Sequence, residues 1–452
     1  MANDTHAAAT PPTTAEAYFR ELSQNMFNRL HATEVLLVNY AAEHSDFVRL
    51  NHNKIRQAGN VAQHELQLDL IANQRQSSAS FNLCGNLATD LATADDLLSQ
   101  LRTLLPHLPV DPYLHIATEV HSSAHHGANN LPSAQDTLQQ IMTSASDLDL
   151  VGIWASGVML HGFANSYGQF NWHSNHNFNF DWSLYYQNDK AVKQAYTGFA
   201  WDDAVFQHKL EHARQTLGLL AKPAKTIPPG QYRVFLTPTA LQELLGLLGW
   251  GGFGLKSHRT QQTPLLKMIK DGLQLNSKVT LLEQHATGLA PMFTAEGFSK
   301  PERVTLIENG HYRDCLSNAR SAKEYATTVN CAVESPQSLQ LSSGSLKQSD
   351  ILPALDTGVY ISNLWYSNYS DRNHCRMTGM TRFACLWVEN GIPIAPLNVM
   401  RFDESLYHAL GDKLLDLTDT QEKLFDAQSY RRRSERSANL PGALIEGFTF
   451  TL

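Results

Sequence analysis

Residues 150–187 read LVGIWASGVMLHGFANSYGQFNWHSNHNFNFDWSLYYQ and indicate the main architecture of the chain. Apolar and polar residues alternate through much of this segment, which is the period of a β-strand. The turn residues Asn165–Gly168 separate two such runs and favour an antiparallel hairpin. A further turn is expected at Asn188-Asp189, followed by a third strand in residues 191–201. The segment therefore predicts a long, aromatic-rich hairpin system.

The residues before this hairpin predict helices and more antiparallel strands. Helical spacing of apolar residues behind an approximate capping signal predicts an opening helix over Thr14–Leu30. Two further helices are expected, one beginning at the N-cap Thr93 and ending at Leu105, the other over Ser133–Ser144. Alternating runs broken by Asn, His, Gly and Ser predict a meander of four short strands, Glu34–Tyr40, Phe47–Leu50, Lys54–Ala58 and Glu65–Ile71.

The residues after the hairpin predict a helix, a linker and a second domain. Asp203–Leu220 has helical spacing, and the next ten residues, AKPAKTIPPG, interrupt both helix and strand. We therefore predict a disordered tail over residues 1–13, an N-terminal α+β domain over 14–225 and a C-terminal β-rich domain over 226–452. The second domain is expected to contain a strand at Tyr232–Leu236, a helix at Thr239–Leu248, and two strands that end in Glu-Asn-Gly turns, Arg303–Ile307 and Ala384–Val388. The fold class is α+β, with largely antiparallel sheets and packed helices.

Composition excludes several functional classes. Hydrophobic residues make up 42% and charged residues 17% of the 452 residues, which is ordinary globular usage. The opening residues lack the basic and apolar regions of a signal peptide, and a formal net charge of -8 disfavours a general nucleic-acid or anionic-membrane binder. The run Arg431–Arg433 is expected to be a solvated loop. Scattered cysteines without a CxxC pair favour reduced thiols and a cytoplasmic location; they are Cys84, Cys315, Cys331, Cys375 and Cys385.

Several segments of the second half resemble the TldD/PmbA family of metalloprotease-related proteins. Ala295-Glu296-Gly297 before the strand and turn of Arg303–Gly310 resembles the family's acidic turn, although Thr294-Ala295 stands where two acidic residues are usual. The other segments are Thr378–Phe383 with Leu386–Gly391, the closing Leu444–Thr449 and, in the first half, the Asn-Ser-x-Gly turn at Asn165–Gly168. The resemblance runs in the same order through nearly the whole chain. It implies a two-domain fold and a role in a two-subunit protease that processes peptides or small proteins.

Catalytic members of this family carry His-Glu-x-x-x-His on a helix and a cysteine near the C-terminus. A catalytic zinc site needs three protein ligands and an open position for water. The matching helix here is LQELLGLLGW, residues 241–250, which contains no histidine, and no cysteine follows Cys385. The chain thus resembles the PmbA/TldE branch. We expect no catalytic residues, no metal ligands and no cofactor in this chain, with zinc in the partner subunit.

The resemblance implies a non-metal subunit that helps to enclose and bind unfolded peptides. Its expected partner is a zinc-bearing TldD-like sister chain, in a heterodimer, or a second copy of itself, in a homodimer. Extended peptides can bind by strand addition at a sheet edge, and edge strands such as Arg382–Val388 are the candidate platforms. The expected substrate-binding residues are Arg382, Phe383, Leu386 and Trp387. The alternatives are a homodimeric peptide-binding or regulatory protein without catalysis, and a metallopeptidase with a non-standard His-rich site.

Two groups of histidines could in principle hold a metal: His115, Glu119, His121, His125 and His126, and separately His161, His173 and His176. Loop-forming residues surround the first group, and His173 and His176 have opposite parity in a strand. Solvated or hydrogen-bonded histidines are therefore preferred.

The aromatic residues of the hairpin suggest an interface and hence a dimer. One face of the strands would be core, and a second aromatic face would suit a protein contact. The residues are Trp154, Phe163, Tyr167, Phe170, Trp172, Phe178, Phe180, Trp182, Tyr185 and Tyr186.

Overall fold

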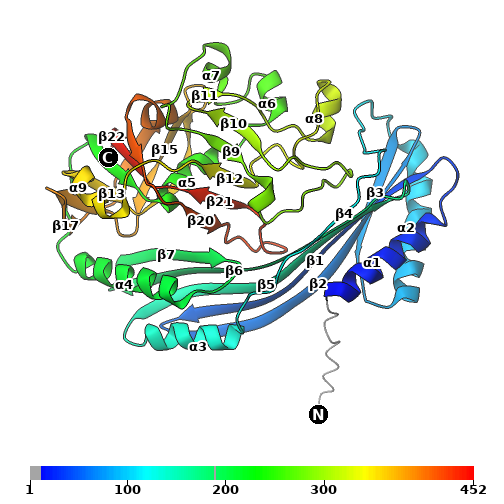
Figure 1. Cartoon of the computed structure of the whole chain (residues 1–452), viewed down its shortest axis with the longest axis horizontal. Helices are drawn as coiled ribbons and strands as arrows, with labels where there is room; N and C mark the ends of the chain where they lie inside the picture. Colours follow the sequence, from blue (N-terminus) through cyan, green and yellow to red (C-terminus); the bar gives the residue numbers. More distant parts are fainter. Residues whose placement is uncertain (1–11, 188–189) are drawn as a thin grey trace.

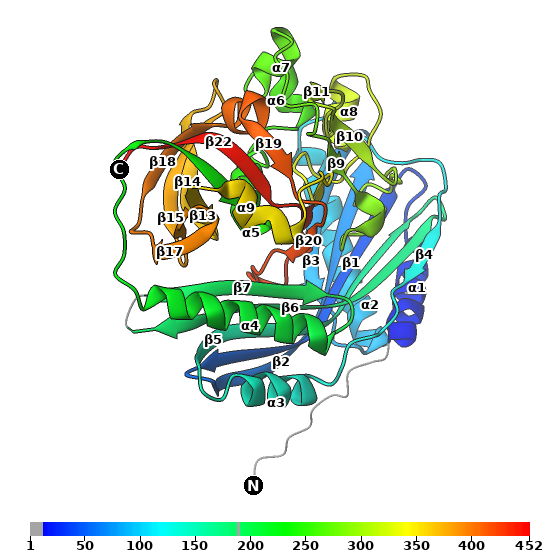
Figure 2. The same ribbon diagram turned by 60° about the vertical axis from the view of Figure 1, so that its left-hand side comes forward.

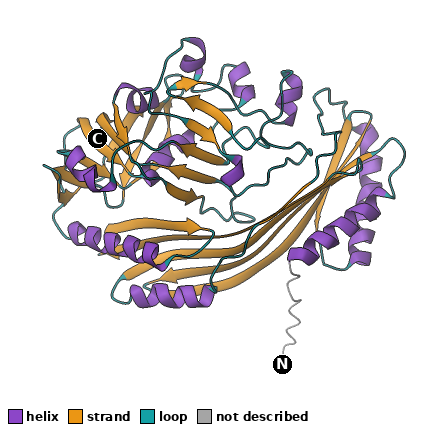
Figure 3. Ribbon diagram, viewed as in Figure 1, coloured by secondary structure: helices purple, strands orange, loops and turns teal. Residues whose placement is uncertain are grey.

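The computed structural model describes residues 12–187 and 190–452 and contains three β-sheets. One sheet of seven strands belongs to the N-terminal half, and sheets of six and nine strands belong to the C-terminal half. Most strand pairs are antiparallel, so the predicted α+β class is confirmed. Figure 1 and Figure 3 show the long strands of the first sheet running beneath the C-terminal half. The expected tail over 1–13 lies outside the described residues up to position 11, and a helix begins at Pro12.

The seven-stranded sheet has the order β3-β2-β1-β5-β6-β4, and β7 also pairs with β6. Its strands are β1 (Val35–Asn51), β2 (Lys54–Ala72), β3 (Arg75–Asn82), β4 (Ser123–His126), β5 (Asp149–Asn165), β6 (Phe170–Tyr186) and β7 (Lys190–Gly198). The predicted hairpin is confirmed, because β5 and β6 pair continuously from Asp149↔Tyr185 to Ala164↔Phe170. The turn expected at positions 188 and 189 lies outside the described residues.

The four short strands expected between residues 34 and 71 are wrong, because β1 and β2 are two long strands. Glu43, at a predicted break, pairs with Gln63 on one side and with Met159 on the other. The ladder therefore continues through the polar residues. Glu43 and Ser45 are buried, and Glu43 contacts Arg433 of the C-terminal half, so the polarity at these positions reflects a buried contact and not a loop.

Helices cover the apolar face of this sheet. The helices α1 (Pro12–Phe27) and α2 (Leu87–Leu104) lie at one end, and α3 (Ala134–Ser144) and α4 (Asp203–Leu220) lie toward the other (Figure 1). The starts of α3 and α4 agree with the sequence to within one residue. The expected start of α2 is wrong: Asn86 caps the helix, and Thr93 lies inside it, where its hydroxyl donates to the Thr89 carbonyl.

The aromatic residues of the hairpin are mostly core, which overturns the aromatic-interface hypothesis. Both aromatic clusters of β5 and β6 are covered within the chain, one beneath α1 and α2, the other beneath α3 and α4. The fully buried members are Trp154, Trp172, Phe178, Phe180 and Trp182, and Phe163 is buried separately against Phe293 of the C-terminal half. The surface that supported the expected dimer is therefore not exposed.

The other face of β6 carries asparagine and histidine side chains and forms the contact between the two halves. Asn179 Nδ2 donates to the Phe425 carbonyl at 3.3 Å. His173 Nε2 donates to the Leu289 carbonyl at 3.0 Å. The alternation of apolar and polar residues in β6 therefore reflects two buried faces. The apolar face packs against the helices, and the polar face packs against the C-terminal half.

Arg433 belongs to this contact, so the expectation of a solvated loop is wrong for it. Its guanidinium donates to the Asn177 carbonyl and side chain, at 3.1 and 2.8 Å, and to the Gly157 carbonyl at 3.1 Å. Arg431, two residues earlier, is exposed. The single buried arginine anchors the loop between two strands of the C-terminal half to the N-terminal sheet.

The nine-stranded sheet has the order β14-β15-β18-β22-β8-β13-β16-β17, and β19 also pairs with β22. Its strands are β8 (Gly230–Leu236), β13 (Gly358–Ile361), β14 (Asn363–Asp371), β15 (Arg376–Arg382), β16 (Leu386–Glu389), β17 (Ile392–Pro396), β18 (Arg401–Ser405), β19 (Leu414–Leu417) and β22 (Ala443–Phe450). The helix α5 (Pro238–Leu247) follows β8. None of the described helices combines the length and apolar character needed to cross a membrane.

The six-stranded sheet has the order β11-β10-β9-β12-β21-β20. Its strands are β9 (Leu281–Glu283), β10 (Val304–Glu308), β11 (His311–Tyr312), β12 (Ser338–Leu341), β20 (Glu422–Phe425) and β21 (Ser437–Leu440). Both Glu-Asn-Gly hairpins are confirmed: Asn309 and Asn390 have φ of 48° and 50°, and a glycine with positive φ follows each. Two positive φ values are what this tight hairpin turn requires.

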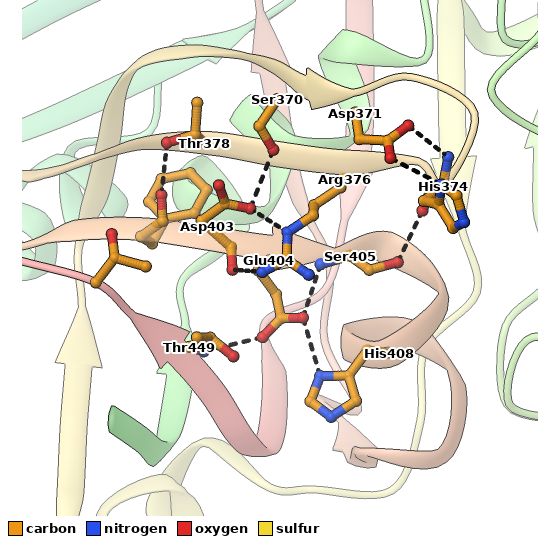
Figure 4. A network of polar contacts seen from close by, with 12 residues as sticks. Ser370, Asp371, His374, Arg376, Thr378, Asp403, Glu404, Ser405, His408 and Thr449 are labelled. Atoms are coloured by element: carbon orange, nitrogen blue, oxygen red, sulfur yellow. Dashed lines mark hydrogen bonds and ion pairs between the residues drawn. The ribbon is translucent and has the colours of Figure 1, made fainter. Parts of the chain in front are cut away.

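A polar network ties the C-terminal strand to its neighbours (Figure 4). The buried Glu404 on β18 accepts hydrogen bonds from His408 Nδ1 and from the Thr449 backbone N–H on β22, both at 2.9 Å. Arg376 on β15 binds Asp403 on β18. These bonds hold β15, β18 and β22 in register.

Candidate functional site

A cleft of about 600 Å³ lies between the two halves of the chain. One wall is α5, and the opposite wall is formed by residues of β6 and β7, including Asp181 and Lys193. Residues of β14 and β15 and the end of β20 complete the lining. Figure 2 shows α5 above β7. The cleft brings together segments from residue 181 to residue 427, so it exists only in the folded chain.

The helix α5 presents a polar stripe to this cleft. Thr237 caps the helix, since its side chain accepts from the Ala240 N–H, and Pro238 occupies the first turn. The leucines of the helix pack into the core. The cleft-facing residues recur at helical spacing: Thr239, Gln242, Glu243, Gly246, Leu247 and, just beyond the helix, Trp250.

Glu243 is the acidic group of this stripe. Its side chain is open to the cleft, yet the walls limit its hydration, and this desolvation raises the pKa of its carboxyl; the nearby Lys193 lowers it to a smaller extent. Lys193 itself lies 3.0 Å from Asp181 across β6 and β7. The cleft therefore contains charged groups of both signs around the Glu243 carboxyl.

Arg382 and Phe383 line the cleft at the end of β15. The Arg382 guanidinium lies 4.6 Å from the ring centre of Trp365 and 5.3 Å from that of Phe383. Phe383 has φ of 60°, in the left-handed region that bulky residues rarely adopt. This backbone turn directs the chain away from β15, and it places an aromatic ring and a guanidinium beside each other in the cleft.

Leu386 and Trp387 do not line this cleft. They lie on β16, which pairs with β13 on one side and β17 on the other, and both are buried. The expectation of one edge strand over Arg382–Val388 is wrong, because residues 383–385 turn between two strands of the sheet. Trp387 Nε1 donates to Glu389 at 2.6 Å, so its polar group is already satisfied. Of the four expected substrate-binding residues, two line the cleft and two lie in the core.

The edge strand of the cleft is β14, which the sequence did not single out. It ends the order of the nine-stranded sheet, and Asn363, Leu364, Trp365 and Ser367 line the cleft. Trp365 and Trp250 are 51% and 55% exposed, which is high for tryptophan. The sequence feature that could have indicated this cleft is Trp250, which lies among glycines at the end of a predicted helix.

The candidate metal-binding histidines are distributed over separate contacts. His121 and His125 do not share a helix, because β4 occupies residues 123–126. His173 and His176 face opposite sides of β6, as their parity predicted, and burial, the largest cause, lowers the pKa of His173 to about 4. His161 binds Glu435 at 2.8 Å. Across residues 12–187 and 190–452, no three His, Cys, Asp or Glu side chains converge in an arrangement that could hold a metal ion.

Comparisons with known proteins agree with this architecture. A family described as the PmbA/TldA metallopeptidase C-terminal domain matches residues 229–452. TldE from Thermococcus kodakarensis has a similar structure, with a TM-score of 0.76 at 13% identity, over 96% of this chain and 100% of that chain. A candidate modulator of DNA gyrase from Thermotoga maritima gives 0.75 at 15% identity, over 96% and 100% of the two chains.

A second candidate gyrase modulator, from Bacteroides thetaiotaomicron, gives a TM-score of 0.75 at 14% identity, over 96% and 98% of the two chains. No curated protein matches the chain in sequence. At these identities the similarity concerns the fold.

Proposed function

This chain belongs to the metallopeptidase-related TldD/PmbA family, and we propose that it is the non-metal subunit of a peptide-processing protease. Its partner in this proposal is a TldD-like sister chain that carries the zinc. The chain itself would bind and help to enclose unfolded peptides. Five free cysteines, three of them buried, support a reducing, cytoplasmic environment.

The observation that carries this proposal is the cleft face of α5. With Glu243 taken as the glutamate of His-Glu-x-x-x-His, Gln242 and Leu247 stand at the two histidine positions. All three residues line the cleft. A carboxamide and an isobutyl group supply none of the imidazole ligands that zinc requires. The helix thus has the acidic residue of the motif without its two histidines.

The remaining lining suits an extended peptide. The strand β14 offers backbone donors and acceptors at a sheet edge, which bind peptides without regard to their side chains. Trp250, Trp365 and Phe383 supply aromatic surface for apolar side chains. Arg382 adds a cation that can bind carbonyl or carboxylate groups of the peptide. A cleft with these groups favours loose binding of many sequences over recognition of one.

Peptide affinity tests this function directly. Fluorescence anisotropy with a labelled, unstructured peptide measures the dissociation constant for wild type, Trp365→Ala and Arg382→Ala. We expect roughly a tenfold loss for Trp365→Ala, because an exposed tryptophan in a cleft is a typical hot spot, and a smaller loss for Arg382→Ala. Tyr430→Ala is the matched control, because Tyr430 is an exposed aromatic residue outside the cleft lining. Equal affinities for Trp365→Ala and the control would show that peptides do not bind here.

A further inference from the structure

A second cavity, of about 330 Å³, lies between the N-terminal sheet and residues 290–300, and it shares no lining residue with the α5 cleft. We propose that this cavity binds a carboxylate monoanion, with Lys300 as the group that neutralises its charge. The proposal is independent of peptide binding at α5. Its occupant would be the C-terminal carboxylate of a peptide or a small free carboxylic acid.

Lys300 is the buried charge of the cavity. It is only 6% exposed, and within the described part of the chain its ammonium group has neither a hydrogen-bond acceptor nor a carboxylate at ion-pair distance. Burial lowers its pKa, while the more distant Glu283 and Glu435 raise it. A buried ammonium group without a direct partner is costly to the folded state. A charged group with a perturbed pKa that lines a cavity is a candidate ligand-binding group.

The Lys300 side chain is directed to the inner side of its segment. Ser299, Lys300 and Pro301 follow one another along an outer groove, as expected for a stretch of backbone. Of these three residues only Lys300 also lines the inner cavity. Glu435, which also lines the cavity, acts on the Lys300 charge, so the ammonium group lies toward the cavity.

The other charges around the cavity are largely paired. Glu435 binds His161 at 2.8 Å, and Glu65 lies 3.5 Å from Arg431. The lining ammonium and guanidinium groups outnumber the lining carboxylates by one. The charged lining residues are Lys300, Arg431, Arg432, Glu65 and Glu435. A monoanion balances this surplus, whereas a doubly charged phosphate would place a second charge near Glu435.

The uncharged lining favours an anion with a small apolar part. Phe293 contributes aromatic surface, and further apolar contacts come from Ala41, Pro291 and Ala332. Gln337 adds an amide whose buried Oε1 has no hydrogen-bond partner among the described residues. An N–H beside the carboxylate, as in a peptide, would satisfy this oxygen. The lining thus fits an aliphatic carboxylate.

Isothermal titration calorimetry at pH 7 tests the proposal with four probes: acetyl-trialanine with a free C-terminus, its C-terminal amide, butyrate and inorganic phosphate. We expect saturable binding of the free-acid peptide, of butyrate or of both, and none of the amide or phosphate. Binding of the peptide alone identifies a peptide C-terminus as the source, and binding of butyrate identifies a free acid. Lys300→Met should weaken binding at least about tenfold, because a charged hydrogen bond is lost.

Lys347→Met is the control, because Lys347 is exposed and lies outside the cavity. It should bind as wild type does, and Arg432→Gln should weaken binding a few-fold. Without ligand, Lys300→Met should melt at or above the wild-type temperature, because the variant removes an unpaired buried charge. A lower melting temperature would identify a structural lysine and overturn the proposal. It is also overturned if no carboxylate probe binds, if phosphate or the amide binds equally well, or if Lys300→Met binds like wild type.

Discussion

The guanidinium of Arg433, in the C-terminal half, lies 3.5 Å from the carboxylate of Glu43 on β1, and their side chains are 6% and 1% exposed. Glu43 also accepts a hydrogen bond from the backbone N–H of Arg433 at 3.0 Å. The pair joins the two halves at a point where both side chains are almost fully buried. Burial lowers the pKa of Arg433, and the nearby carboxylates of Glu43 and Glu435 oppose this shift. The contact between the halves therefore depends on both members being present.

Removal of one member should be strongly destabilising. We expect Arg433→Met to lower the free energy of unfolding by about 3–5 kcal/mol, because Glu43 would remain buried without a counter-charge. Urea denaturation followed by tryptophan fluorescence measures this change. Arg431→Met is the matched control in the same loop, and because Arg431 is exposed we expect a change within about 0.5 kcal/mol. Similar losses in the two variants would contradict the assigned role of Arg433.

Arg433 also shows what the sequence could not reveal. A run of three arginines among polar residues predicts a solvated loop, and two of its members fit that expectation better than the third. Which one is buried depends on the Asn177 and Gly157 carbonyl groups, which lie more than 250 residues away in sequence. The same long-range packing explains β1, where polar residues such as Glu43 lie in a continuous strand. Local patterns predicted the elements, and the second half of the chain determined which polar face is buried.

The linker between the halves should be the first site of limited proteolysis. Residues 221–224 are exposed, whereas Lys225 is fixed through its N–H to the Pro396 carbonyl at 2.8 Å. We expect proteinase K to cut first within residues 221–226, and we expect the two fragments to elute together in size exclusion, because the buried contacts persist. Mass spectrometry of the fragments locates the cut. An earlier cut within residues 151–187 or 190–201 would contradict the predicted domain division near residue 225.

His173 should make the protein sensitive to mild acid. Its pKa is about 4 in the folded state and near 6.5 when unfolded, chiefly because of burial. Between these values the unfolded chain binds more protons, so stability falls as the pH decreases from 6.5 to 4, by up to about 3 kcal/mol. His173→Gln should reduce this slope in denaturation curves measured across that range. His107→Gln, at an exposed histidine, should leave the slope unchanged; equal slopes in both variants would exclude the assignment.

Glu283 should have the opposite pH dependence. Burial raises its pKa to about 7, and the backbone N–H groups of Gln337 and Ser338 lower it to a smaller extent. The folded state therefore binds the proton more tightly than the unfolded state, and this stabilisation is lost as the pH rises from about 4.5 through 7. Glu283→Gln keeps an acceptor without the charge, so it should gain stability over wild type at pH 8 and little at pH 5. A difference that does not change with pH would contradict this prediction.

The candidate site was only partly predictable from the sequence. Arg382 and Phe383 line the cleft, whereas Leu386 and Trp387 belong to the core, because the chain turns at the left-handed backbone of Phe383. A positive φ at phenylalanine has no reliable sequence signal. The cleft face of α5 was easier to predict, because the sequence indicates this helix and the helix resembles the motif-bearing helix of the family. What the sequence could not supply was the opposing wall of β6 and β7, which packing alone brings to Glu243.

Native mass spectrometry of the complex copurified from the source organism tests whether this chain pairs with a zinc-bearing sister. We expect one copy of this chain with one copy of a zinc-bearing sister, and a single zinc ion that remains with the sister chain when the complex is dissociated. This result requires that α5 here, with Gln242 and Leu247 at the histidine positions, holds no zinc. Recovery of this chain only as a homodimer, or of a stoichiometric zinc ion on this chain, would contradict the account.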